Sequence, residues 1–132
     1  MGNPLTERIK IGTIGELLVQ TRLLQYDVQA APPIKDSGND LIAVKGEAFR
    51  GVQVETTAGA RVSQRPLPEH YHILAIVHLH STDDELLLDQ SPIYLVPRLI
   101  IDRNNGSAPT QLEDFAISAA HVAQLFQQLV RL

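Results

Sequence analysis

The fold is decided by a stretch of sequence from Asp40 to Glu55 that reads DLIAVKGEAFRGVQVE. Apolar residues fill 41–44 and recur through 49–56, and the Lys-Gly-Glu-Ala segment between them can turn the chain back on itself. The pattern therefore predicts a hairpin of two antiparallel strands.

Polar side chains gather where this hairpin opens. Pairing Val44 with Phe49 sets Asp40 opposite Gln53. Because side chains alternate along a strand, Gln53 and Glu55 point to one face, and apolar neighbours form a floor on the other. We expect two carboxylates and an amide to lie together there.

Other elements are predicted on both sides of the hairpin. Thr13 and Glu16 have the spacing of a capping box at a helix start, which gives Glu16 a purely structural alternative role. The segment 70–80 is apolar on both faces in its middle, as expected for an interior strand. The order of elements predicts an α/β fold with a mixed central β-sheet flanked by helices. The predicted elements are helices at 13–26 and 118–131, and strands at 28–30, 41–44, 49–56, 70–80 and 93–96.

The length and composition of the chain are those of one globular domain, residues 1–132. No segment approaches the roughly 20 apolar residues of a membrane span, so we expect no membrane partner. The chain has no Cys and opens on no secretory leader pattern, which favours a cytoplasmic protein. The net charge of -4 opposes broad adhesion to nucleic acid, although Arg50, Arg61 and Arg65 are candidates for a local basic patch.

The polar group at the hairpin has the chemistry of a divalent metal site. Mg²⁺ and Mn²⁺ are hard cations that take oxygen ligands, and Mg²⁺ keeps several waters, so two or three carboxylates on rigid elements are sufficient. Asp40 and Glu55 provide two carboxylates, Glu16 is a candidate third, and Gln53 adds an amide oxygen. We expect a Mg²⁺ or Mn²⁺ site that polarises a phosphate and activates water.

At these residues the sequence resembles the PD-(D/E)XK nuclease superfamily, and in particular its small members that are similar to Holliday-junction resolvases. GTIGELLV resembles the helix whose Glu assists the metal, SGNDLIAV the strand that begins with Asp, and GVQVETT the strand that carries (D/E)-X-K. The resemblance implies a restriction-endonuclease-like core and metal-dependent endonuclease activity on DNA, linear or branched. It places Glu16, Asp40, Gln53 and Glu55 at catalytic and metal-binding positions, and it implies a homodimer with one site per strand.

Two positions depart from that pattern. Gln53 keeps an oxygen ligand but removes a charge, and Glu55 stands where Lys is usual. A carboxylate cannot stabilise developing negative charge as Lys does, although it can ligate a metal or act as a general base. Lys35 and Lys45 are candidates to replace the missing cation. The alternative is a catalytically inactive module of the same fold that binds nucleic acid or protein.

Two His-x-His pairs, at 70/72 and 78/80, share one face of the predicted strand 70–80. The pairs are roughly 20 Å or more apart along an extended strand, so they cannot form one metal site. We interpret them as polar residues that mark the ends of a buried strand.

Overall fold

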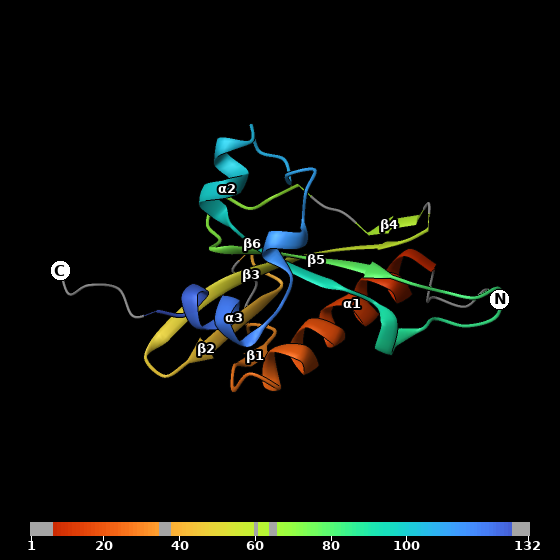
Figure 1. The fold of residues 1–132 in the computed structure, drawn as a ribbon, viewed down its shortest axis with the longest axis horizontal. Coiled ribbons are helices and arrows are strands. Elements are labelled where there is room, and N and C mark those ends of the chain that lie inside the picture. Colours follow the sequence, from red (N-terminus) through yellow and green to blue (C-terminus); the bar gives the residue numbers. More distant parts are fainter. Residues whose placement is uncertain (1–6, 35–37, 60, 64–65, 128–132) are drawn as a thin grey trace.

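The sheet and its covering helices follow the predicted order of elements (Figure 1). The structure, a computed structural model, describes residues 7–34, 38–59, 61–63 and 66–127. The helices are α1 (Glu7–Leu24), α2 (Arg98–Arg103) and α3 (Ala119–Leu125), with 3-10 turns at Leu88–Gln90 and Glu113–Phe115. The strands are β1 (Gln29–Ala31), β2 (Leu41–Lys45), β3 (Ala48–Ala58), β4 (Arg61–Ser63), β5 (Ile73–Leu79) and β6 (Ile93–Pro97).

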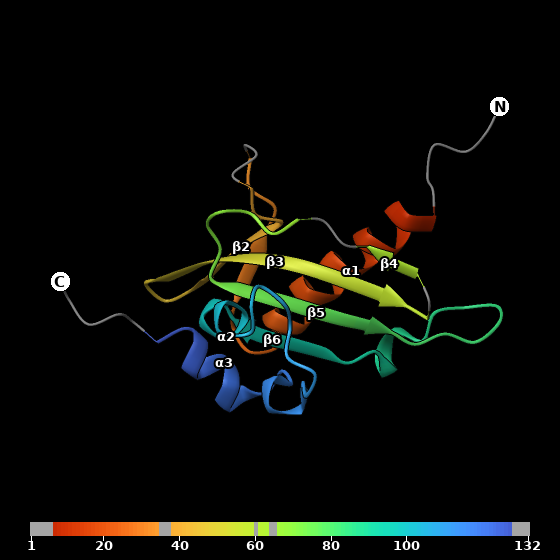
Figure 2. The same cartoon turned by 90° about the horizontal axis from the view of Figure 1, so that it is seen from above.

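The sheet is mixed, as predicted. Its strand order is β1-β2-β3-β5-β6, and β4 pairs with the far end of β3. Strands β3 and β5 are parallel, and every other pairing is antiparallel. The β2–β3 hairpin has the predicted register, with Val44 opposite Phe49. Figure 2 shows β3, β5 and β6 side by side, with α1 crossing behind them.

One face of the sheet packs on α1. The buried residues of this helix recur every four positions, at Ile11, Gly15, Val19 and Leu23, and they join the even-numbered side chains of β3 and the odd-numbered side chains of β5 in one core. At Gly15 the helix lies so close to β3 that a Cβ atom would come within 2.9 Å of the Thr56 Cβ atom. Glycine is therefore required there by close approach.

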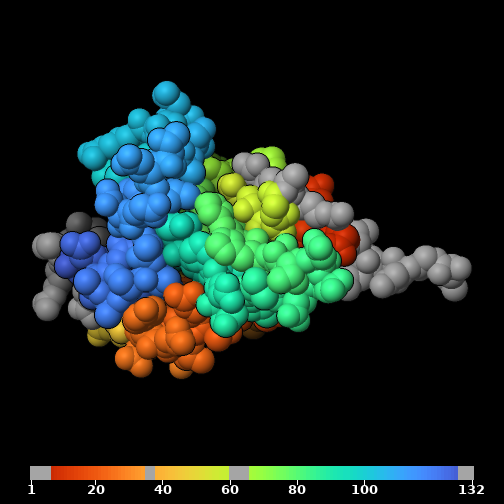
Figure 3. Space-filling view, turned by 45° about the vertical axis from the view of Figure 1, so that its right-hand side comes forward, coloured from red at the N-terminus to blue at the C-terminus, as the bar shows by residue number. Residues whose placement is uncertain are grey.

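The other face of β5 packs on α2 and the segment after it. Leu74, Ile76 and Val96 form a second core with Tyr71 and Ile101, so β5 is buried on both sides, as predicted. In Figure 3 this segment, in cyan and blue, stands as a raised lobe above the sheet. The odd-numbered side chains of β3, Gln53 and Glu55 among them, belong to this second face by alternation.

Several predicted boundaries are wrong. Helix α1 begins at Glu7, because its apolar stripe already includes Ile11, so Thr13 is inside the helix and the capping box with Glu16 does not exist. The segment after β3 contains the short strand β4, which was not predicted. Helix α2 was not predicted either, because six residues are too few to show a helical period.

The last helix is shorter than predicted. Ser118 caps α3 as expected, its hydroxyl accepting the His121 amide, but the helix ends at Leu125. The end of the predicted helix, 128–131, lies outside the described residues. Among the helices that the structure describes, none is both long enough and apolar enough to cross a membrane.

Candidate active site

Asp40 lies at the point where β2 and β3 separate. The backbone ladder ends at the pair Leu41 and Val52, and beyond it the Asp40 carboxylate replaces a main-chain acceptor: its Oδ2 accepts a hydrogen bond from the Val54 amide at 2.8 Å. Asp40 is only 9% exposed. A hydrogen bond to an ionised acceptor is roughly twice as strong as a neutral one, so this contact holds the carboxylate beside the next turn of the strand.

Gln53 is adjacent to this contact and has an unsatisfied oxygen. Its side chain is buried, and its Oε1 has no hydrogen-bond partner among the described residues. The Oδ1 of Asn39, which packs against Gly51, is likewise buried without a partner there. Thr56 Oγ1, at the contact with α1, is the third such atom in the described part of the chain. Buried polar atoms nearly always have a partner, so the Gln53 oxygen, which lies on the strand that Asp40 anchors, is a candidate ligand for a cation.

Glu55 is half-buried on the same side of β3 as Gln53. Burial raises the pKa of its carboxyl group, and the nearby His78 opposes that rise in the pKa. His78 is on β5, opposite Thr57, and its ring meets Tyr94 edge-on at 5.3 Å between centroids. Glu55 is thus a carboxylate with increased basicity whose neighbour can carry positive charge.

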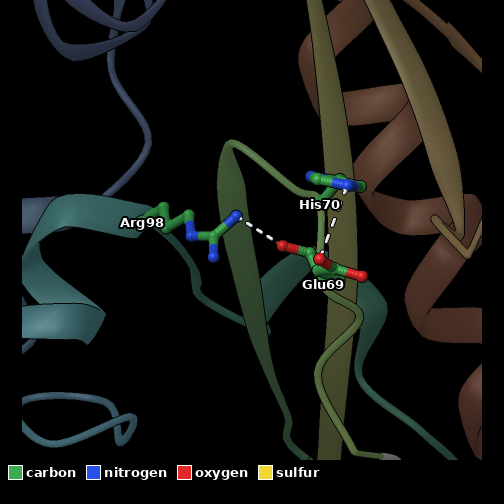
Figure 4. A network of polar contacts seen from close by, with 3 residues as sticks. All are labelled: Glu69, His70 and Arg98. Carbon is green, nitrogen blue, oxygen red and sulfur yellow. Dashed lines mark hydrogen bonds and ion pairs between the residues drawn. The ribbon is translucent and has the colours of Figure 1, made fainter.

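Glu55 opens into a cavity of about 490 Å³ between β3, β5 and α2. Arg98, at the start of α2, is a cation in the wall of this cavity. Its guanidinium carbon lies 4.9 Å from the centre of the Tyr71 ring, and its Nη1 donates to the Glu69 carbonyl at 2.7 Å. Figure 4 shows Arg98 reaching toward Glu69 and His70, ahead of β5. The cavity is lined by Glu55, Pro66, Leu67, Pro68, Tyr71, Leu74, Arg98, Asp102, Gly106, Ser107 and Ala108.

Glu16 comes from a different element, the helix that covers the other face of β3. It is half-buried on α1, next to Gly15, which packs on Thr56 of β3. Among the described residues, no three His, Cys, Asp or Glu side chains lie close enough to hold one metal ion. Asp40 is thus bonded to the strand that carries Gln53 and Glu55, and these two side chains share one face of β3 by alternation. Glu16 does not join Asp40 and Glu55 in a group of three acidic side chains.

The chemistry of the side chains of Asp40, Gln53 and Glu55 fits a hard divalent cation. The orphaned Oε1 of Gln53 is the observation that tests the fit, because a metal ion is one partner that this buried oxygen lacks. Together with the carboxylates of Asp40 and Glu55 it supplies oxygen ligands only, and Mg²⁺ keeps waters in its remaining positions.

The cation expected at the Lys position does not come from Lys45. Its ammonium group donates to the Tyr26 carbonyl at 2.8 Å, at the end of β2 remote from Asp40. Lys35 lies outside the described residues. The structure does place the His78 ring and the Arg98 guanidinium near Glu55, and neither was predicted from the sequence. The position of His78 in the strand could have indicated this. Because side chains alternate, His78 is on the same face of β5 as the buried Leu74 and Ile76, which is the face toward Glu55.

The remaining histidines form no joint site. His70 and His80 are exposed, and His72 Nδ1 accepts a hydrogen bond from the Gly51 amide at 2.8 Å. Of the three arginines considered for a basic patch, Arg50 bonds carbonyls at the end of α3, and the side chains of Arg61 and Arg65 are outside the description.

Comparison with known proteins bears on the fold. No protein-family model matches the chain, and no curated protein matches it in sequence. Among solved structures, a bacterial homing endonuclease, I-Ssp6803I, matches with a TM-score of 0.56 and 15% sequence identity, over 95% of this chain and 93% of that one. The similarity therefore covers nearly the whole of both chains, and this protein has a fold similar to that of the homing endonuclease.

Proposed function

We propose that this protein is a metal-dependent DNA endonuclease of the PD-(D/E)XK type, which hydrolyses a phosphodiester bond by attack of water. The observation that carries the proposal is the Asp40 carboxylate anchored on the Val54 amide, beside the orphaned oxygen of Gln53. The similarity of fold to a protein described as a homing endonuclease supports DNA as the substrate.

The residues divide the chemistry between them. Asp40 and Gln53 would hold Mg²⁺ or Mn²⁺ with Glu55, and the bound ion supplies charge that polarises the phosphate and acidifies a water. Glu55 would also take the proton of the attacking water, through the carboxylate oxygen that does not hold the ion. The oxygen of the water would bond to phosphorus as the ester P–O bond breaks, the leaving alkoxide oxygen would take a proton from a solvent water, and Arg98 would offset charge that develops on the phosphate.

Glu16 has a supporting place in this scheme. It does not complete a group of three with Asp40 and Glu55, so it would act on a metal-bound water and not as a third direct ligand. Cutting both strands of a duplex requires two such sites, which favours a homodimer with one site per strand.

The test is cleavage of linear and branched DNA by the purified chain. We expect cutting only with Mg²⁺ or Mn²⁺, and loss of cutting in Asp40→Asn. The matched control is Asp84→Asn in the exposed turn after β5, which makes the same chemical change away from the site. Cutting that survives Asp40→Asn, or that proceeds equally in EDTA, contradicts the proposal.

One observation favours a second candidate, a catalytically inactive module of the same fold. Glu55 occupies the position at which the PD-(D/E)XK motif has Lys, and Lys45 cannot replace that Lys because its ammonium group donates to the Tyr26 carbonyl. An inactive module predicts no cleavage and no Mn²⁺ binding by calorimetry. If Glu55→Lys creates cutting in an inert parent, the module is the correct description, because the usual residue has then restored the usual chemistry.

A further inference from the structure

A second cavity, of about 440 Å³, lies at the end of the sheet where β3 and β5 meet α2 and α3. None of its described lining residues is acidic, although acidic residues outnumber basic ones 15 to 11 in the whole chain. The cavity is a local basic site on an acidic protein, and such sites attract anions. It is lined by Arg50, Tyr71, His72, Ile73, Pro97, Arg98, Leu99, His121, Gln124 and Leu125.

Arg50 keeps its charge in this cavity. Its Nε and Nη2 donate to the carbonyls of Leu125 and Gln127 at 3.0 and 2.7 Å, and its Nη1 donates to the Phe49 carbonyl at 2.9 Å. These partners are neutral main-chain oxygens, so they orient the guanidinium without cancelling its charge. A guanidinium has five N–H groups, which leaves donors for a ligand.

His72 presents a donor of known orientation. Because its Nδ1 accepts the Gly51 amide hydrogen, the neutral ring carries its proton on Nε2. Burial and the charges of Arg50 and Arg98 lower the pKa of His72, so the ring is neutral at pH 7 and still offers that Nε2–H. The carbonyl of Leu95 likewise fixes His121 as a donor through Nε2 at 2.7 Å.

The two cavities adjoin, because Tyr71 and Arg98 line both. Arg98 donates to the Glu69 carbonyl (Figure 4) and lies over the Tyr71 ring. Its Nε is 3.5 Å from Asp102, in an exposed pair that solvent screens. Its charge therefore contributes to both cavities. The acidic metal site and the basic cavity form two parts of one surface.

We infer that the second cavity binds a backbone phosphate of the same DNA strand that carries the scissile bond. The inference rests on the proposed function. Arg50 lies five residues before Glu55 on β3, and its side chain leaves the opposite face of the strand by alternation, so it reaches the second cavity at the end of the sheet beside α3. Because Tyr71 and Arg98 line both cavities, a strand with its scissile phosphate at Glu55 would continue past the second cavity, where Arg98 and Arg50 can meet another of its phosphates.

Charge substitution at Leu99 tests this inference. Leu99 is 57% exposed and lines the second cavity, and Leu24, which is 61% exposed at the end of α1, lies outside both cavities. Leu99→Glu and Leu24→Glu change the net charge equally, as do Leu99→Lys and Leu24→Lys. Affinity is measured by fluorescence anisotropy with a short labelled duplex and no added divalent metal, so that no cutting occurs. Thermal unfolding of each variant confirms that it is folded.

We expect Leu99→Glu to weaken DNA binding about threefold relative to Leu24→Glu. Leu99→Lys should strengthen DNA binding by a similar factor relative to Leu24→Lys. This factor corresponds to a unit charge about 7 Å from a phosphate in water. Equal affinities within each matched pair overturn the inference and leave the nuclease proposal standing. Binding with the expected pattern but no cutting in Mg²⁺ overturns the nuclease activity alone. A wild-type chain that binds no duplex overturns both.

A second measurement reports on the cavity directly. The Gly51 amide donates to His72, so its NMR resonance senses a ligand on the His72 ring. Titration with the same duplex should shift this resonance in wild type and Leu24→Glu, and shift it less in Leu99→Glu at equal DNA concentration. An unchanged Gly51 resonance in a wild-type chain that binds the duplex contradicts the inference.

Discussion

Asp40 has two separable roles, and comparing two substitutions distinguishes them. Its carboxylate anchors β3 through the Val54 amide at 2.8 Å, and it is also a proposed metal ligand. Asp40→Ala removes the acceptor and leaves a buried amide unpaired, whereas Asp40→Asn keeps an oxygen that can still accept from Val54. The alanine variant should therefore lose stability and metal binding, and the asparagine variant mainly metal binding.

The magnitude follows from the contact. Leaving one buried donor unsatisfied costs about 1–3 kcal/mol, and hydrogen bonds to charged groups contribute about 1.5–3 kcal/mol. We expect Asp40→Ala to lower the free energy of unfolding by about 2–3 kcal/mol, or Tm by roughly 6–10 °C for a chain of this length. Asp40→Asn should remain within about 1 kcal/mol of wild type, since a neutral acceptor replaces a charged one.

Urea unfolding without metal measures the first role, and calorimetric titration with Mn²⁺ measures the second. Equal stability of Asp40→Ala and Asp40→Asn would refute the anchoring role. Wild-type Mn²⁺ affinity in Asp40→Asn would refute the ligand role. The two results are independent, so either part of the reasoning can fail alone.

Three other predictions concern stability. Gly15→Ala should destabilise the fold by about 1–2 kcal/mol in urea unfolding. Overpacking against the buried Thr56 costs about 1–3 kcal/mol, which exceeds the roughly 1 kcal/mol gained in helix propensity. No loss of stability, or an equal loss in a Thr56→Ala background, argues against the contact. Glu55→Gln should be more stable than wild type at pH 7, because a raised carboxyl pKa in the folded state means that stability is lost as pH rises through it. That gain should vanish below the pKa of about 4.3 of an unfolded Glu, and a constant gain at pH 7 and pH 4 would show another cause. His72 has a lowered pKa, so its contribution to stability is complete above about pH 6.5 and is lost as pH falls below that value. Between pH 8 and pH 5, Tm should therefore fall less in His72→Gln than in wild type. Curves of Tm against pH that run parallel in the two proteins would contradict the lowered pKa of His72.

Local patterns in the sequence predicted the hairpin and its register. Alternation with a period of two, together with a short turn, leaves one pairing that keeps Val52 and Val54 on the buried face, and that pairing sets Asp40 beside Gln53. The interior position of β5 was also predictable, because its middle is apolar on both faces. These features depend on residues close together in the chain.

The start of α1 and the existence of α2 were not predictable in the same way. The first turns of α1 carry polar residues that show no apolar period before Ile11, and α2 is too short to show any period. The separation of Glu16 from the carboxylates on β2 and β3 depends on how α1 lies across the sheet. That packing is set where Gly15 meets Thr56, a contact between distant segments.

The sequence by itself determined the hairpin, its register and the mixed sheet, because these follow from side-chain alternation and a short turn. Only the tertiary structure decided which side chains from other elements lie near Glu55 and that a basic cavity adjoins the cavity that Glu55 lines. His78 is near Glu55 through the parallel pairing of β3 with β5, and Arg98 lines both cavities from α2. Those contacts join strands and helices that long connections separate in the chain, so their register is set by packing of the whole core and not by any local pattern.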